Sequence, residues 1–225
     1  MNSLPTGIVF AGIIVTLIIL WYSLRRYEGH FSERKLFLSF LAGIAMGFVI
    51  IVLEFVTSDV GLLYIILFPA VEQFSKLMIM NLKTFQKKRE APFYGLSIGL
   101  GFGAIFVPLS TLMITTAMGT EDVLFLIVSL LFGVGVVLFH GATGCMLGYG
   151  VASIDERKKW RYLVLAILAG IPIAGLEFGL LFIKEPIASY IGGIVPLYGV
   201  LLYWRVTDRF LPLALKRRER RKIKS

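Results

Sequence analysis

The stretch VLFLIVSLLFGVGVVLFHGATGCMLGYGVA, residues 123–152, contains no Asp, Glu, Lys or Arg. A helix needs about 20 predominantly apolar residues to cross a membrane, and lipid forces a chain to satisfy its backbone polar groups within its own segment. The stretch therefore predicts a transmembrane helix that is long enough to tilt, bend or protrude. Gly133 and Gly135 are the positions at which we expect it to bend.

Further apolar runs lie on both sides of this stretch. We predict helices over 7–24, 36–56, 61–82, 93–118, 161–183 and 187–204, with a bend at Pro108. Hydrophobic residues make up 57% of the 225-residue chain, above the roughly 45–50% of a soluble domain. The sequence therefore predicts an all-α, polytopic membrane helix bundle of about seven transmembrane helices. We expect one domain over 1–206 and a basic tail over 207–225.

The distribution of charge tests this count. Of the 23 Lys and Arg residues, 21 fall in loops 25–35, 83–92 and 153–161 or in the tail from Arg205 onward. The alternate loops are acidic, with Lys184 as their single basic residue. Because basic loops stay in the cytoplasm, the pattern predicts a multi-pass cell-membrane protein with its N-terminus outside and its C-terminus cytoplasmic. The net charge of +9 then faces the lipid bilayer, and we expect no nucleic-acid partner.

Four ionisable residues fall within the predicted helices, where charge is expensive and marks candidate functional residues. They are Glu72, Lys76, His140 and Glu177. Glu72 and Lys76 are spaced i,i+4, so they share a helix face and can pair. The pair is either an internal salt bridge or a carboxylate kept charged and directed at water. Glu54 lies near a helix end and is less informative.

Small residues recur every three or four positions in two of the predicted helices, which indicates close helix packing. The first set is Gly95, Gly99 and Gly103, and the second is Gly141, Gly144 and Gly148. His140, next to the second set, is either a hydrogen-bonded core residue or the partner of a carboxylate on another helix.

Motifs for other chemistries are absent from the sequence. It has no phosphate-binding glycine loop, no two-histidine zinc motif and no nucleophile elbow. We therefore expect no cofactor and no metal. A metal would have to use His140 together with Glu72 and Glu177.

The order of these residues resembles the PrsW family of intramembrane proteases, related to the CAAX-processing and bacteriocin-processing group. The run 71–76, VEQFSK, resembles a motif of two glutamates followed three residues later by lysine, and the run 94–107, YGLSIGLGFGAIFV, resembles a second motif that ends in Glu-Asn. Two further family motifs are also matched. One is a membrane histidine followed by small residues, as at His140, and the other is an acid followed by an aromatic, as at 177–178. The chain departs from the family at three places, namely Gln73, Phe106-Val107 and Ile173.

The resemblance implies peptide hydrolysis inside the membrane without a covalent intermediate. Glu72 would act as general base on a water, with Lys76 orienting it. His140 would polarise the carbonyl or hold the water, and Glu177 would orient His140. The implied substrate is a transmembrane peptide or membrane protein. The three departures predict activity that is slow or lost and that depends on Glu72 more than on His140.

Two further functions stay open. The chain could be a non-catalytic relative that binds a transmembrane segment or lipid, which the three departures favour. It could also be a small-solute or proton-coupled transporter that uses Glu72, Lys76 and Glu177, although it shows no convincing internal repeat. The protease requires all four ionisable residues to face one cavity. At 1.5 Å per residue, Glu72 lies about 16 Å below the start of its helix and His140 about 25 Å below that of its own, so we expect helix 123–152 to protrude or bend.

Overall fold

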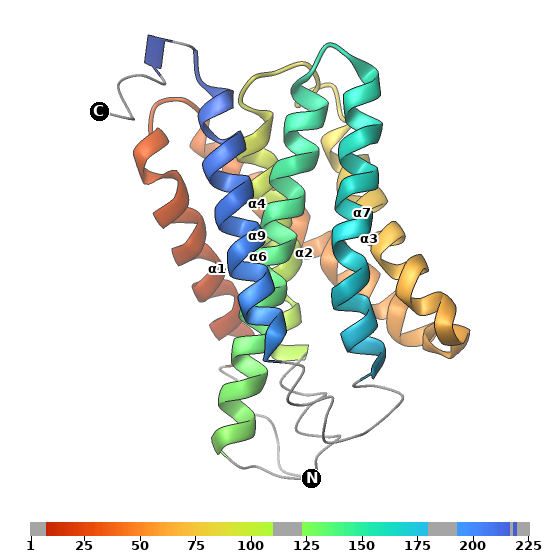
Figure 1. The fold of residues 1–225 in the computed structure, drawn as a ribbon. Coiled ribbons are helices and arrows are strands. Elements are labelled where there is room, and N and C mark those ends of the chain that lie inside the picture. Colours follow the sequence, from red (N-terminus) through yellow and green to blue (C-terminus); the bar gives the residue numbers. More distant parts are fainter. Residues whose placement is uncertain (1–7, 110–122, 180–192, 217, 220–225) are drawn as a thin grey trace.

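The computed structural model describes residues 8–109, 123–179, 193–216 and 218–219, and this part of the chain is helical with no strand. Figure 1 shows its main helices side by side in one bundle. They are α1 (Ile8–Leu24), α2 (Glu33–Val56), α3 (Tyr64–Met80), α4 (Ala91–Ala104), α6 (Val123–Ala152), α7 (Glu156–Phe178) and α9 (Ile194–Phe210). Short 3-10 turns are η1 (Arg25–Tyr27), η2 (Ser58–Leu63) and η4 (Pro212–Ala214). The predicted all-α fold is confirmed.

Within the described residues, five segments are long and apolar enough to cross a membrane. They are Glu33–Glu54, Val60–Met80, Ala91–Leu109, Ser129–Ala152 and Glu156–Phe178. The outer faces of the bundle carry exposed large apolar side chains, which a soluble monomer rarely gathers into a wide surface. Examples from α1, α2, α3, α7 and α9 are Phe10, Trp21, Phe48, Met78, Leu168 and Leu197.

The helix boundaries differ from the prediction where local chemistry decides them. α7 begins at Glu156 rather than at 161, because the Asp155 carboxylate caps it and accepts a hydrogen bond from the Arg157 backbone N–H at 3.0 Å. α9 continues to Phe210 rather than ending at 204, and Val206 and Phe210 are buried on its inner face. The predicted residues 110–118, 180–183 and 187–192 lie outside the described residues.

The predicted bend at Pro108 corresponds to a break in the helix. α4 ends at Ala104, Ile105 interrupts it, and helical structure resumes over 106–109. Proline has no backbone N–H, so the carbonyl of Ala104, four residues earlier, has no intrahelical donor there. In α6, by contrast, the helix is uninterrupted through Gly133 and Gly135.

α4 is the central helix, and every residue from Ala91 to Ala104 is buried. It packs between α2 and α6, with α1 also against it. A Cβ at Gly95 would meet the backbone carbonyl of Gly144, and a Cβ at Gly99 would meet that of His140. The prediction that these small residues serve close helix packing is therefore confirmed. α6 also packs against α7 and α9, and α7 covers α3.

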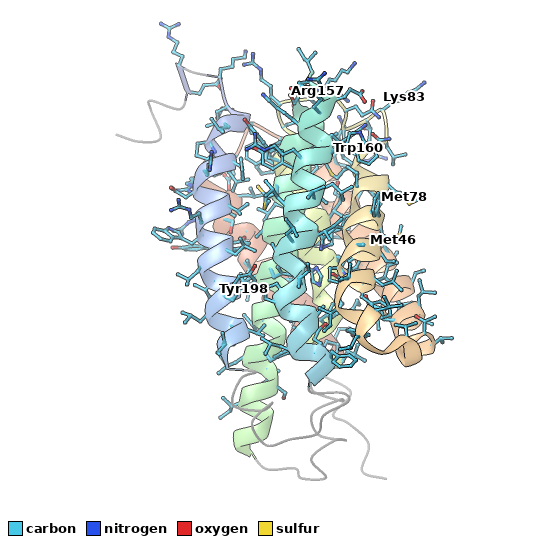
Figure 2. All side chains as sticks on the ribbon, turned by 45° about the vertical axis from the view of Figure 1, so that its right-hand side comes forward. Met46, Met78, Lys83, Arg157, Trp160 and Tyr198 are labelled. Carbon is cyan, nitrogen blue, oxygen red and sulfur yellow. The ribbon has the colours of Figure 1, made fainter. Side chains whose placement is uncertain are left out.

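The turn η1, the α3–α4 and α6–α7 connections and the end of α9 all lie at one end of the bundle (Figure 1). Figure 2 shows Lys83 and Arg157 at this end, with Trp160 just below them. The loops that the sequence marks as basic are therefore on the same side of the fold. The depth of the buried polar residues below this end follows from the number of helical residues between them and the connections.

Candidate functional site

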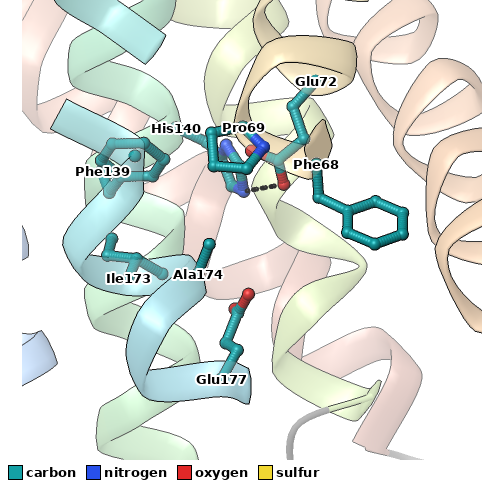
Figure 3. Close-up of a pocket in the computed structure, with 9 residues that line it drawn as sticks. Phe68, Pro69, Glu72, Phe139, His140, Ile173, Ala174 and Glu177 are labelled. Atoms are coloured by element: carbon teal, nitrogen blue, oxygen red, sulfur yellow. Dashed lines mark ion pairs between the residues drawn. The ribbon is translucent and has the colours of Figure 1, made fainter. Parts of the chain in front are cut away.

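Glu72 of α3 and His140 of α6 meet inside the bundle. Glu72 Oε1 lies 3.7 Å from His140 Nε2, and both side chains are buried (Figure 3). The difference in depth expected from the sequence is taken up by the length of α6, whose first turns project beyond the start of α3 in Figure 1. Close contact between α6 and α4 at Gly99 and Gly103 fixes where His140 enters the bundle.

Lys76, one turn after Glu72, is directed at His140 rather than at Glu72. Its Nζ lies 2.7 Å from His140 Nδ1, and it donates to Gln73 Oε1 at 3.1 Å and to Thr143 Oγ1 at 3.2 Å. Of the two alternatives that the i,i+4 spacing left open, the internal salt bridge is not among the ion pairs of the described residues, although the two charges interact electrostatically. The i,i+4 spacing allows a pair, but α6 offers Lys76 closer partners.

Gln73 joins the two halves of this network. Its side-chain oxygen accepts from Lys76, and its Nε2 donates to Glu72 Oε2 over 3.5 Å. Thr143 accepts from Lys76 and donates to the His140 carbonyl at 3.1 Å. Thr143 is a partner that was not predicted from the sequence. Its position three residues after His140, on the same face of one helix, was the available signal.

Aromatic rings enclose the polar groups. The ring centroids of Phe102 and Phe106 each lie 4.8 Å from that of His140, and the centroid of Phe139 lies 5.0 Å away. Lys76 Nζ also lies 4.7 Å from the centre of the Phe102 ring, within cation–π range. Water is therefore excluded from most of the network, which strengthens its electrostatic interactions.

A cavity of about 10 Å³ lies between α3, α6 and α7. Glu72, His140 and Glu177 are among its lining residues, which also include Phe68, Pro69, Phe139, Gly170, Ile173 and Ala174. A space of this size holds about one water molecule. Three of the four predicted site residues therefore line one cavity. The fourth, Lys76, is behind it and reaches it through His140.

Glu177 enters the cavity from α7 on the far side of Ala174, and its carboxylate points toward the Glu72–His140 pair in Figure 3. In the described residues, His140 forms its ion pair with Glu72. Ile173, one turn before Glu177, is buried and lines the cavity with an apolar side chain. Glu177 is thus a second carboxylate at the cavity, and the close contact that orients His140 comes from Lys76.

Glu54 of α2, which the sequence marked as less informative, belongs to the same buried region. It is 9% exposed and interacts electrostatically with Glu72 and Glu177. Among the described residues, its Oε1 has no hydrogen-bond partner. It lies near the end of α2, as its position along the chain indicates, and it is nevertheless buried there. Tyr64 of α3 also interacts electrostatically with all three glutamates.

The cavity has a hydrogen-bond acceptor, the Glu72 carboxylate, on one side and a potential donor, His140 Nε2, on the other. Among the described residues, His140 Nε2 has no hydrogen-bond partner, so it is free to bond to an oxygen in the cavity. Within that same part of the chain, no group of three His, Cys, Asp or Glu side chains is arranged to hold a metal ion. The site can hold a water, take a proton from it at Glu72 and stabilise an oxygen at His140. Comparison of the chain with models of protein families, with curated proteins and with solved structures finds no match.

Proposed function

We propose that this protein is an intramembrane peptidase of the PrsW type, in which Glu72 activates a water molecule beside His140. The observation that carries the proposal is the distance of 3.7 Å between Glu72 Oε1 and His140 Nε2 at a cavity of one-water size. A water there can contact both atoms at once. Buried acid–base pairs of this kind are functional candidates by default in membrane helices.

The reaction needs two proton transfers and no covalent enzyme intermediate. Glu72 takes a proton from the water as its oxygen attacks the peptide carbonyl carbon, and His140 donates a hydrogen bond to the oxygen that gains charge. The C–N bond then breaks, and the proton on Glu72 passes to the leaving amine. The carboxylate is regenerated, and the products are a carboxylic acid and an amine.

Access to the cavity limits the rate. A peptide is far larger than a space of about 10 Å³, so α3 and α7, which supply most of the lining, have to separate to admit it. Phe106 and Ile173 place apolar groups beside His140 and at the cavity wall, where neither supplies a hydrogen-bond donor. Loss of one such donor lowers turnover by about 10²–10³ in other hydrolases. We therefore expect slow cleavage.

The proposed setting is the cell membrane, with seven spans, the N-terminus outside and the C-terminus in the cytoplasm. Five helices of sufficient length and hydropathy in the described part of the chain support it, together with the position of the basic connections at one end of the bundle. α1 and α9, each of 17 residues, would be the first and last spans. The bilayer is then the first partner of the chain, and a membrane-embedded peptide is the second.

The decisive experiment is a cleavage assay on purified protein in lipid nanodiscs with synthetic transmembrane peptides. Glu72→Gln should abolish cleavage, because an amide cannot accept the proton from water. The matched control is Glu156→Gln, since Glu156 lies at the exposed start of α7. Equal cleavage by the two variants would refute the role of Glu72.

A non-catalytic relative that binds transmembrane segments is the second candidate, and the packing of Phe106 on His140 favours it. The double variant Gln73→Glu with Phe106→Glu separates the two. It returns the acid at position 73 and an acid beside His140. Cleavage gained in this variant and lost again on adding Glu72→Gln supports a weakened peptidase. An intact fold with no cleavage in any variant makes the binding protein the better conclusion.

A further inference from the structure

Lys76 is fully buried, at 0% exposure, yet it does not line the cavity. A protonated lysine carries three N–H donors and no acceptor. The structure gives its Nζ three hydrogen-bond partners, namely Gln73 Oε1, Thr143 Oγ1 and His140 Nδ1. Each proton of the ammonium group therefore has one acceptor, and each of the three partners has to accept a hydrogen bond from Lys76.

Two of the three partners, Gln73 and Thr143, are clearly acceptors toward Lys76. Gln73 presents its oxygen to Lys76 while its Nε2 points to Glu72. Thr143 accepts from Lys76 and uses its own hydroxyl proton on the His140 carbonyl. Both partners thus act as acceptors toward Lys76. The remaining contact, at 2.7 Å to His140 Nδ1, is the shortest of the three.

We propose that Lys76 is a positioning residue that holds His140 in its neutral form with the proton on Nε2. While Lys76 is an ammonium group, an N–H on Nδ1 would face one of its protons across 2.7 Å, so Nδ1 is the bare nitrogen. The proton then sits on Nε2, the atom that faces Glu72 Oε1 and has no other recorded partner in the described residues. His140 is therefore a donor toward the cavity and Glu72 the acceptor.

The consequence for chemistry rests on the proposed function, whereas the position of the proton does not. With Nε2–H facing the cavity, His140 cannot take a proton from water and serves only to donate to an oxygen. Glu72 is then the sole base, and Lys76 acts on the reaction through His140. Lys76 would affect turnover without touching water or substrate.

The position of the proton can be measured directly because the chain has two histidines, His30 and His140. His30 lies in a connection at the surface, where its Nδ1 is 3.9 Å from Glu219. The variant His30→Gln leaves His140 as the single histidine. With ¹⁵N-labelled histidine in lipid bilayers, nuclear magnetic resonance distinguishes the protonated ring nitrogen from the bare one. We expect the proton on Nε2 at neutral pH. A proton on Nδ1, or on both nitrogens, would overturn the proposal.

A second measurement tests whether Lys76 is the cause. In His30→Gln protein, Lys76→Met keeps a chain of similar length but removes the donors. The ratio of the Nε2–H to the Nδ1–H form should fall about tenfold or more, the effect of losing a hydrogen bond from a charged donor. Lys159→Met is the matched control, because Lys159 contacts Glu156 and Asn81 at the surface. An unchanged ratio in folded Lys76→Met protein would show that another group fixes the ring.

The two proposals fail separately. If Lys76→Met does not fold, the spectrum of the His30→Gln protein still decides where the proton is. Absence of cleavage with the proton on Nε2 refutes the peptidase and leaves the role of Lys76 in place. Cleavage that depends on Glu72, with the proton on Nδ1, supports the peptidase and refutes the role of Lys76.

Discussion

Substitution of Gly99 by alanine tests the helix contact that positions His140. The added Cβ would collide with the His140 carbonyl oxygen and lie 2.8 Å from the His140 carbonyl carbon and 3.0 Å from Gly141 Cα. All three atoms belong to the backbone of α6, so no side-chain rotation relieves the contact. Ordinary contacts begin at 3.4 Å, so the contact with the carbonyl carbon alone needs a separation of about 0.6 Å between α4 and α6, and the closer carbonyl oxygen needs more.

The expected penalty follows from this separation. A gap of 0.5–1 Å forfeits about a quarter to a half of the dispersion energy of each contact. In lipid these contacts carry helix association, since lipid tails are as apolar as the side chains they replace. Overpacking of this kind typically costs about 1–3 kcal/mol. We expect the upper end of that range, because α4 is buried on every side.

The control is Gly175→Ala in α7, where a Cβ would have no heavy atom within 4 Å. The chemical change is the same, and alanine favours a helix over glycine by about 1 kcal/mol. Because this gain applies at both positions, the two variants should differ by the packing cost alone, about 1–3 kcal/mol in free energy of unfolding. Reversible unfolding in mixed micelles, followed by the helical circular dichroism signal, measures this difference. Equal stability of the two variants would refute the close approach of α4 and α6.

The remaining predictions concern the network and the topology. Lys76→Met should lower the free energy of unfolding by about 3 kcal/mol or more, because it removes the cation that interacts with the buried carboxylates. Glu54→Gln should be neutral or stabilising, because it removes one of several buried carboxylates. The reverse order of stability in unfolding assays would contradict this view of the buried charges. Thr143→Val keeps the side-chain shape but leaves one Lys76 donor unpaired, at about 1–3 kcal/mol in the same assay, and no loss would mean that water replaces the hydroxyl. In a cysteine-free background, Leu62→Cys should react on intact cells with a thiol reagent that cannot cross membranes, and Lys88→Cys should not; labelling of both from the same side would refute the proposed topology.

The sequence alone located the helices and their close contacts. Apolar runs of sufficient length predict helices in lipid whatever lies around them, and α6 ends at Ala152, where the sequence placed its end. The glycine spacings predicted close packing, because a missing Cβ matters only where another backbone approaches. The cost of burying charge also singled out Glu72, His140 and Glu177, which the structure brings to one cavity.

Only the tertiary structure decided which of these groups touch. Lys76 has Glu72 one turn away on its own helix, yet it bonds to His140 and Thr143 of α6 because helix rotation and tilt bring their atoms nearer. Glu54 is near the end of its own helix, and its burial beside the other carboxylates depends on how the helices pack. Spacing along one helix limits which residues share a face. The partner opposite that face is set by packing between helices, which hydropathy and local spacing do not encode.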